Sequence, residues 1–599
     1  MTAVVVSTAG AMEMGRSVAG LLVAPVHARN DGDVGFETLA DHLRGLFSTG
    51  EAIVFVGPVG ALVRMLAPVL ADKTSEPPVV AVAIDGSAVV PVLGGHRGAN
   101  DLARRIAENF GIAPAITTAG DLVFGLAPGL ALDAPPAGWH LATPERYKDI
   151  AARLIAGAPA RLDGPANWIA ASDIALSDDA EITLQVTERA GPYDPDRLVY
   201  VAETLALGVG SERGADPTEM IRLVTETLRQ HGLDPRAVAG VFPLDLKADE
   251  PAMHALADAL GRPARFFDAA TLEAEASRLA TPSETVFREV GCHGVSEGAA
   301  LAAAGPEARL LVVKHKSERC TCAIAIAPRP IEAAAIGRPR GRLSLVGIGP
   351  GKSEWRTPEA ERLIGRAEDL VGYSLYLDIL GPLTDGKMRH DYPLGDETER
   401  ARAALDLAAE GRNVALISSG DIGIYAMASL VFELVAKEDR GDWGRLEIEV
   451  APGISALQAA AARIGAPLGH DFCAISLSDL LTPWEVIERR LQAAAEGDFV
   501  VAFYNPVSLR RRHQLPRARE ILLEHRPPKT PVILARSLGR PEETVRVTTL
   551  ETLSVDDVDM LTLVMVGSST THYDGRFVHT PRGYLAAGKR DIGPERRQA

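Results

Sequence analysis

Short runs of aliphatic, β-branched residues alternate with amphipathic stretches along most of the chain. Near its start, the runs VVVSTAG, AIVFVGP, VVAVAID and AVVPVL predict strands, and residues 100–111 predict a helix. Leu102, Ile106 and Phe110 recur every four residues in that helix, and Asn100 can cap its start. This alternation is typical of α/β domains with largely parallel sheets. We therefore predict a multidomain α/β protein.

Breaks in this pattern divide the chain. A stretch of weaker periodicity with Pro-rich pieces predicts a small central domain, and APRPIEAAAIGRPR, with three prolines and no apolar face, predicts a linker. The predicted parts are an N-terminal α/β domain, the central domain, a second α/β domain, the linker and a C-terminal unit with two lobes: residues 1–120, 121–195, 196–328, 329–341 and 342–590, the lobes being about 342–455 and 456–590.

Composition agrees with this division. The chain has 599 residues, which at roughly 150 residues per domain suggests about four domains. Hydrophobic residues make up 47% and charged residues 24%, a balance that excludes a largely disordered protein. Aromatic residues are only 5%, so we expect cores built from Ala, Val, Leu and Ile.

Charge and cysteine content limit the partners. A net charge of −17 argues against a surface devoted to nucleic acid or anionic lipid. The start MTAVVVSTAG predicts a buried strand rather than a signal peptide, and the apolar run 52–63 is too short to span a bilayer. Four cysteines suit a reducing compartment, and Cys320-Thr321-Cys322 lacks a second pair for zinc. We expect a cytoplasmic protein with no metal, membrane or nucleic-acid partner.

Four loops of the C-terminal half carry small and polar residues directly after predicted strands. They are GIGPG, SSGDIGIY, APGISA and YNP, at residues 347–351, 418–425, 451–456 and 504–506. Glycine lets a backbone turn sharply and approach a ligand closely. In open α/β sheets, ligands bind beyond the carboxyl ends of the strands. The first loop lacks the GxGxxG spacing of a dinucleotide site, so we expect a different ligand.

In this order the four motifs resemble the tetrapyrrole (corrin and porphyrin) methyltransferases, from residue 343 to about 584. VGYSLYLD, SLSDLLTPWEVIERRL and FYNPVSLRRRHQL are similar to the precorrin-3B C-17 methyltransferase branch, and Ile422 stands where the wider family usually has proline. The resemblance implies two α/β lobes with S-adenosylmethionine between them, a polycarboxylate macrocycle as substrate and a homodimer formed through this half. By motif, it implies cofactor contacts at Gly349, Pro350, Gly420, Asp421, Ile424, Ser455, Ala456 and Tyr504.

The implied reaction methylates precorrin-3B at C-17 and contracts the ring to give precorrin-4. Because the sulfonium is already activated, positioning of the methyl group should supply most of the acceleration. Ring contraction expels carbon 20 as an acetyl group and requires a base for the carbon-20 hydroxyl. His390, Asp391 and Asp479 are candidates among which the sequence does not choose, and an ordinary structural role stays open for each.

A basic cluster lies inside this acidic chain, at Arg510, Arg511, Arg512, His513, Arg517 and Arg519. One interpretation is a solvated helix face or an ion-pair surface between subunits. The other is a set of guanidinium forks, Arg510 to Arg512, that bind the acetate and propionate groups of a tetrapyrrole. Nucleic acid is less favoured because few aromatic residues interleave with the arginines.

The N-terminal half carries GGHRGAND, GVGSERGA, CHGVSEGAAL and VVKHKSE, at residues 94–101, 208–215, 292–301 and 312–318. These motifs resemble the cobalt-precorrin-5A hydrolase family over about residues 1–328. The resemblance implies opening of the ring-A lactone with release of acetaldehyde, which needs a water activator and an oxyanion stabiliser. His96 and Glu297 are candidate bases and Lys314 and Lys316 candidate carboxylate clamps, with a structural role open for each.

Two functional hypotheses follow for the whole chain. The first is a bifunctional enzyme of cobalamin biosynthesis that joins the methyltransferase to the hydrolase. The second is an active methyltransferase beside a non-catalytic module that binds or channels corrinoids. A methyltransferase acting at another corrin carbon, C-11 or C-20, also stays open. The absence of a cysteine cluster for an iron–sulfur centre favours the cobalt-free branch of the pathway.

Overall fold

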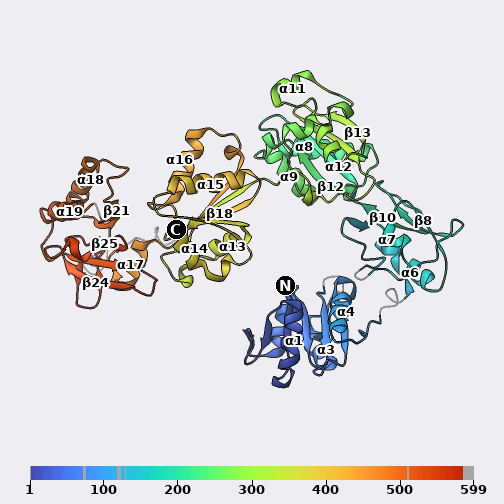
Figure 1. Ribbon diagram of the computed structural model, residues 1–599, viewed down its shortest axis with the longest axis horizontal. Helices are drawn as coiled ribbons and strands as arrows, with labels where there is room; N and C mark the ends of the chain where they lie inside the picture. Colours follow the sequence, from blue (N-terminus) through green and yellow to red (C-terminus); the bar gives the residue numbers. More distant parts are fainter. Residues whose placement is uncertain (1, 72–75, 118–122, 128–129, 509–510, 584–599) are drawn as a thin grey trace, which may run out of the picture. The chain divides into compact units, whose positions relative to one another are not determined.

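The computed structural model describes residues 2–71, 76–117, 123–127, 130–508 and 511–583 (Figure 1). Contacts divide the chain into two compact units, one of residues 1–244 with 250–337, the other of residues 245–249 with 338–599. The boundary between 337 and 338 falls inside the predicted linker. Each unit contains several sheets covered by helices, which confirms the multidomain α/β class.

The first sheet, in the order β3-β2-β1-β4-β5-β6, is parallel except for β6. Leu102 and Ile106 of α4 are buried against it and Phe110 packs at the end, as the helical spacing predicts. Its strands and helices are β1 (Thr2–Val6), β2 (Val26–Ala28), β3 (Val34–Gly35), β4 (Ala52–Val56), β5 (Val79–Val82), β6 (Val89–Leu93), α1 (Met12–Leu22), α2 (Leu39–Ser48), α3 (Val59–Leu66) and α4 (Ala99–Asn109).

A small sheet in the order β7-β10-β9-β8 follows. Aromatic rings pack in its core: Trp168 lies edge-on against Trp139 and Tyr200, with ring centroids 6.0 and 5.3 Å apart. The elements are β7 (Trp139–Leu141), β8 (Ala160–Asp163), β9 (Ile182–Val186), β10 (Arg197–Ala202), α6 (Tyr147–Ile155) and α7 (Asn167–Ala170).

The last sheet of this unit has the order β12-β11-β14-β13. Helix α12 lies directly on β11, and a Cβ atom at Gly208 would stand 1.9 Å from the Ser296 carbonyl oxygen, so only glycine permits this approach. Its elements are β11 (Leu205–Ser211), β12 (Val238–Pro243), β13 (Arg309–Lys316), β14 (Cys320–Ile326), α8 (Pro217–Gln230), α9 (Pro251–Leu260), α10 (Ala269–Glu273), α11 (Glu284–Val290) and α12 (Val295–Ala304).

The second unit begins with a fully parallel sheet in the order β17-β16-β18-β15-β19. Helices cover both faces, which explains why the central strands are continuously apolar in sequence. The elements of this first lobe are β15 (Arg342–Gly347), β16 (Asp369–Tyr373), β17 (Met388–Tyr392), β18 (Asn413–Ser418), β19 (Glu447–Ala451), α13 (Pro358–Arg366), α14 (Ser374–Leu380), α15 (Glu397–Ala409) and α16 (Met427–Glu438).

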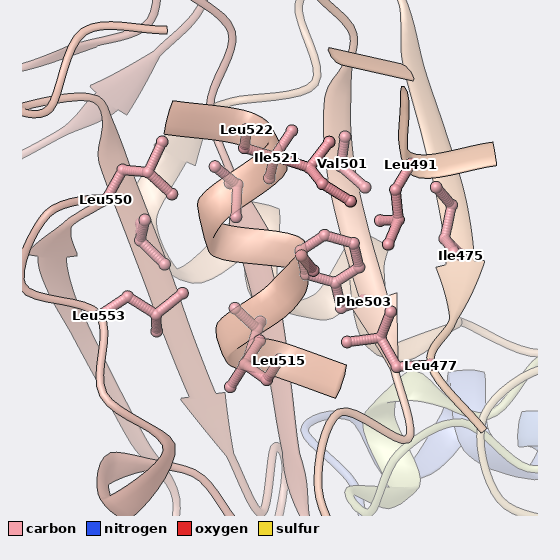
Figure 2. Close-up of a cluster of buried hydrophobic side chains, with 14 of the residues drawn as sticks. Ile475, Leu477, Leu491, Val501, Phe503, Leu515, Ile521, Leu522, Leu550 and Leu553 are labelled. Carbon is pink, nitrogen blue, oxygen red and sulfur yellow. The ribbon is translucent and has the colours of Figure 1, made fainter. Parts of the chain in front are cut away.

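A mixed sheet in the order β21-β22-β25-β23-β24 forms the second lobe. Figure 2 shows one of its cores, in which Leu515 and Ile521 of α19 share a cluster with Val501 and Phe503 of β22. The elements are β21 (Phe472–Ser476), β22 (Val500–Tyr504), β23 (Pro531–Arg536), β24 (Thr544–Thr549), β25 (Thr562–Val566), α17 (Ala456–Ile464), α18 (Trp484–Glu496) and α19 (Gln514–Leu523), with short strands β20 (Gly465–Ala466), β26 (His572–Tyr573) and β27 (Val578–His579).

Candidate functional site

Three loops meet beyond the carboxyl ends of β15, β18 and β19. The Gly349 N–H donates to the Gly420 carbonyl at 3.1 Å, and the Gly420 N–H donates back to Gly349 at 2.8 Å. A Cβ atom at Gly347 would lie 2.7 Å from the Gly420 oxygen, and one at Gly453 only 2.1 Å from it. The loops therefore pack backbone against backbone, and the glycines of the motifs are what allow it.

The open side of these loops lies at Gly420. This residue has φ +72°, and a Cβ atom there would meet nothing within 4 Å. We call the three loops with this opening the glycine cradle (residues 347–351, 419–425 and 452–456). Its backbone groups and open side fit a ligand that approaches the main chain closely, as the resemblance implies for S-adenosylmethionine.

Asp421 ties two loops of the glycine cradle together. Its Oδ1 accepts from the Gly423 N–H at 2.8 Å, and its Oδ2 accepts from the Gly453 N–H at 3.1 Å. Each carboxylate oxygen keeps a second lone pair that a bound molecule can use. The carboxylate thus has a structural role that the sequence motif alone does not reveal.

Ser455 and Ala456 begin α17. The Ser455 Oγ accepts from the Gln458 N–H at 3.4 Å, while the Gln458 Oε1 accepts from the Ser455 N–H at 3.0 Å. This reciprocal pair is a capping box, which satisfies free N–H groups at the helix start. Ser455 is therefore occupied in fixing the third loop.

Two tyrosines lie together beside the glycine cradle, and Tyr425 reaches across from the first lobe to the second. The Tyr504 hydroxyl accepts from the Leu457 N–H at 3.2 Å, and the Tyr425 hydroxyl donates to the Ala474 carbonyl of β21 at 2.8 Å. Their ring centroids are 5.3 Å apart, and burial raises the pKa of both phenols. Tyr425 adopts φ +51°, an uncommon conformation for a non-glycine residue. The loop of Ile424 thus reaches the second lobe.

Arg540 also bridges the lobes, and no sequence motif indicated it. Its Nε donates to the Pro350 carbonyl at 3.2 Å, and its guanidinium reaches the Ser419 Oγ at 3.4 Å. Next to it, a Cβ atom at Gly351 would stand 2.5 Å from the Gly539 oxygen. This turn of the second lobe is 190 residues from the first loop in sequence, so only the fold brings them together.

The structure places His390 away from this edge. Its Nε2 lies 2.7 Å from Oδ1 of the fully buried Asp369, which Arg412 also binds at 2.6 Å. Asp369 and Arg412 lie at the amino ends of β16 and β18. His390 is therefore directed toward the edge opposite the glycine cradle, an orientation that does not favour it as the ring-contraction base.

Asp391 and Asp479 differ in what surrounds them. The Arg389 guanidinium lies 2.7 Å from Asp391 and lowers the pKa of that carboxyl, which weakens it as a base. Asp479 follows β21, on the edge where Tyr504 ends β22, and is exposed. Its Oδ2 accepts from the Nε2 of the buried Gln514 at 2.9 Å.

The described arginines of the predicted cluster have different partners. Arg511 is buried and donates to the Ser478 Oγ at 3.1 Å and to the Asn505 carbonyl at 3.0 Å, so it fastens loops of its own lobe. Arg512 pairs at the surface with Asp556 at 2.5 Å. Arg510 lies outside the described residues. Arg511 and Arg512, although neighbours in sequence, thus contact different parts of the lobe.

In the N-terminal unit, Glu297 is saturated with hydrogen bonds. The fully buried carboxylate accepts from the N–H groups of Ala280, Thr281 and Lys314 at 2.8, 2.9 and 2.9 Å, and from the Thr281 hydroxyl at 3.0 Å. These four donors fix the carboxylate between the segment of residues 280–281 and β13. Its contacts give Glu297 a structural role instead.

The other candidate residues of the hydrolase-like region have different surroundings. The Lys314 Nζ reaches the Thr281 carbonyl at 3.5 Å, and Lys316 is exposed at the end of β13. His96 lies in a turn between Gly94, with φ +65°, and Gly98, with φ +109°; its side chain is outside the described residues.

His293 is a further residue that the sequence did not single out. Its Nδ1 lies 2.9 Å from Glu273 Oε1, its ring stacks on Phe287 at 4.4 Å, and the Glu273 hydrogen bond raises its pKa. A carboxylate that orients an imidazole is an arrangement suited to proton transfer. The motif CHGVSEGAAL contains it, but its partner lies 20 residues upstream.

Cys320 and Cys322 are both buried, as expected for small core side chains on one strand face. Among the residues that the structure describes, no group of three or more His, Cys, Asp or Glu side chains is arranged to hold a metal ion. The helices in this part of the chain are all too short or too polar to cross a membrane.

Family models match three regions of the chain. Residues 342–554 match Tetrapyrrole (Corrin/Porphyrin) Methylases, residues 205–325 match Cobalamin synthesis G C-terminus, and residues 41–121 match Cobalamin synthesis G N-terminal. These matches confirm both resemblances found in the sequence.

Curated relatives align with the C-terminal half. The probable cobalt-factor III C(17)-methyltransferase of Salmonella typhimurium is 48% identical over 242 residues, 40% of this chain and 99% of the relative. The precorrin-3B C(17)-methyltransferase of a Sinorhizobium species is 45% identical over 254 residues, 42% of this chain and 99% of the relative.

Other relatives are longer. The cobalamin biosynthesis protein CobIJ of Mycobacterium tuberculosis is 46% identical over 257 residues, 42% of this chain and 49% of the relative, so the chain spans about half the length of such relatives. Among solved structures, the methyltransferase CobJ has 44% identity and a TM-score of 0.39, covering 40% of this chain and 100% of that one.

Proposed function

The chain belongs to the tetrapyrrole methylases through its C-terminal half, and from this premise we propose that it transfers a methyl group from S-adenosylmethionine to C-17 of precorrin-3B. The observation that carries the proposal is the glycine cradle, whose motifs stand at the carboxyl edge of a parallel sheet. Two relatives aligned over nearly their whole length bear C-17 methyltransferase names.

The cofactor would lie against the glycine cradle. Gly420 leaves the backbone open to it, Gly349 fixes that loop through its backbone pair with Gly420, and Asp421, Ser455 and Tyr504 hold the loops in place. Pro350, Ile424 and Ala456 are the further contacts that the family resemblance implies. When bound, S-adenosylmethionine supplies an already activated methyl group. The task of these residues is to orient it and to exclude water, which is where most of the rate gain of such a transfer arises.

For ring contraction, we assign the base to Asp479. It is the one of the three candidates that lies on the edge of Tyr504 without an arginine or a buried carboxylate at hydrogen-bond distance. Gln514 donates to one oxygen and leaves the other to accept the proton of the carbon-20 hydroxyl.

The test uses the full chain with S-adenosylmethionine and precorrin-3B. We expect the unmodified protein to give a product that carries one additional methyl group and has the acetyl-bearing, contracted ring. Asp479→Asn is expected to lower the yield of contracted product by at least tenfold while leaving cofactor affinity unchanged. Equal ring contraction by this variant would contradict the assignment.

For the N-terminal unit we propose the cobalt-precorrin-5A hydrolase activity of its family, with His293 and Glu273 as the water-activating pair. A second candidate, a module that binds corrinoids without hydrolysis, is favoured by the saturated Glu297. Acetaldehyde release from cobalt-precorrin-5A by the full chain separates them. His293→Ala should abolish release, while Glu297→Gln should lower the thermal stability of this unit.

A further inference from the structure

Arg400 carries a buried charge that its surroundings hardly compensate. It lies early in α15 and is only 3% exposed. Its guanidinium has one acidic neighbour among the described residues, Glu397, at 3.5 Å, and its Nε has no hydrogen-bond partner there. Burying a guanidinium in this state is costly, and an apolar side chain would fold at lower cost. We therefore infer that Arg400 serves ligand binding rather than the stability of the fold.

Arg540 also lacks a carboxylate partner among the described residues, and it contacts the loop at the carboxyl edge of the same parallel sheet. Within the described chain, its side chain donates only to neutral acceptors, the Pro350 carbonyl and the Ser419 hydroxyl. No carboxylate of the described residues pairs with it. Through Pro350, its charge is held directly beside the first loop of the glycine cradle.

Tyr376 is the third side chain at this edge of the sheet. It stands on α14, at the carboxyl end of β16, with its ring edge-on to Tyr373 at 5.2 Å. Burial raises the pKa of its phenol, while the positive charges of Arg540 and Arg400 oppose that rise. Arg400 and Tyr376 stand in the first turns of the helices that follow β17 and β16, and Arg540 contacts the loop that follows β15, so the three side chains belong to the carboxyl edge of one parallel sheet.

We propose that Arg400, Arg540 and Tyr376 form a subsite for one carboxylate of the macrocyclic substrate. Two guanidinium groups and a hydroxyl offer the charged N–H and O–H donors that bind carboxylates most strongly. The subsite would anchor an acetate or propionate group next to the glycine cradle and so fix the ring against the methyl donor. The inference rests on the proposed function, because that function supplies a polycarboxylate substrate, and it takes the place of the Arg510–Arg512 assignment.

The test compares binding of two ligands to the full chain. Uroporphyrin III, an octacarboxylate porphyrin, serves as a fluorescent probe of the macrocycle site, and S-adenosylhomocysteine probes the cofactor site by calorimetry. Arg400→Gln and Arg540→Gln are each expected to weaken porphyrin binding by about tenfold or more, the effect of losing a charged hydrogen bond. Cofactor-site affinity should change by less than about twofold in Arg400→Gln.

Arg402→Gln is the matched control. Arg402 is two residues further along α15 and pairs with Glu438 at the surface, so its loss should leave both affinities unchanged. Arg400→Met separates binding from folding, because it removes the uncompensated buried charge. We expect it to unfold at the same temperature as the unmodified protein or higher, with porphyrin binding lost.

Two results would overturn the subsite. Porphyrin binding by Arg400→Gln and Arg540→Gln at the unmodified affinity would show that these arginines do not bind the macrocycle. A marked loss of stability in Arg400→Met would show a structural role. Failure of the unmodified protein to bind the porphyrin, with S-adenosylhomocysteine still bound, would instead contradict the proposed substrate class.

Discussion

Three residues that the sequence predicts as cofactor contacts have a structural role in the site. Asp421, Ser455 and Tyr504 were expected to contact a cofactor, and each also completes a hydrogen bond that holds a loop in shape. Such residues preorganise the site, so that binding need not order the loops at the same time. Their removal should affect stability and affinity together.

Asp421→Ala tests this double role. It leaves the N–H groups of Gly423 and Gly453 without their acceptor, which we expect to cost about 1–3 kcal/mol of unfolding free energy. S-adenosylmethionine affinity should fall in the same variant. Urea denaturation and calorimetry measure the two effects; an unchanged stability with lower affinity would assign Asp421 to the cofactor alone.

Cys320 gives a pH-dependent prediction. Burial raises the pKa of its thiol from 9.0 to about 11, because the desolvated thiolate is disfavoured. Little thiolate is present at pH 8, so alkylation by iodoacetamide should be slow there and accelerate as the pH rises toward 11. The contribution that this thiol makes to the free energy of unfolding is fully present below pH 9 and is lost as the pH rises from 9 to 11. Fast alkylation of Cys320 in the native protein at pH 8, detected by peptide mass mapping, would contradict this.

At the scale of elements, sequence patterns predicted the strands and the loops after them, because period and glycine content are local properties. They did not predict side-chain direction. His390 was grouped with the site, but its strand turns it toward Asp369 at the opposite edge. Arg540 and Tyr425 went unassigned because their partners, Pro350 and Ala474, are brought to them only by tertiary contacts.

Glycines of the cradle should respond differently to alanine. Gly453→Ala places a Cβ atom 2.1 Å from the Gly420 oxygen and should disrupt the loops, lowering stability by about 2 kcal/mol or more. Gly420→Ala meets open space, so its main cost is the strain of φ +72°, about 1 kcal/mol, with a larger loss of cofactor affinity. Gly365→Ala, in α13 with free space around it, is the control and should be neutral or stabilising. Thermal unfolding ranks the three, and the reverse order for Gly453 and Gly420 would contradict the packing described.

At the scale of the whole molecule, the acidic chain joins two units related to one biosynthetic pathway. The overall charge of −17 is compatible with an anionic substrate because binding depends on local charge, which the proposed subsite assigns to Arg400 and Arg540. Among the described arginines of the predicted basic cluster, Arg512 and Arg517 pair with carboxylates, whereas Arg511 and Arg519 donate to neutral acceptors. Composition could not distinguish a compensated arginine from an uncompensated one.

The central claim is methyl transfer to C-17, and the position of the new carbon tests it most directly. The full chain is incubated with precorrin-3B and S-adenosylmethionine labelled with carbon-13 in its methyl group, and the product is examined by NMR. We predict a single enriched methyl signal, attached to C-17. Enrichment at C-11 or C-20, or transfer of no label while the cofactor analogue binds, would contradict the account.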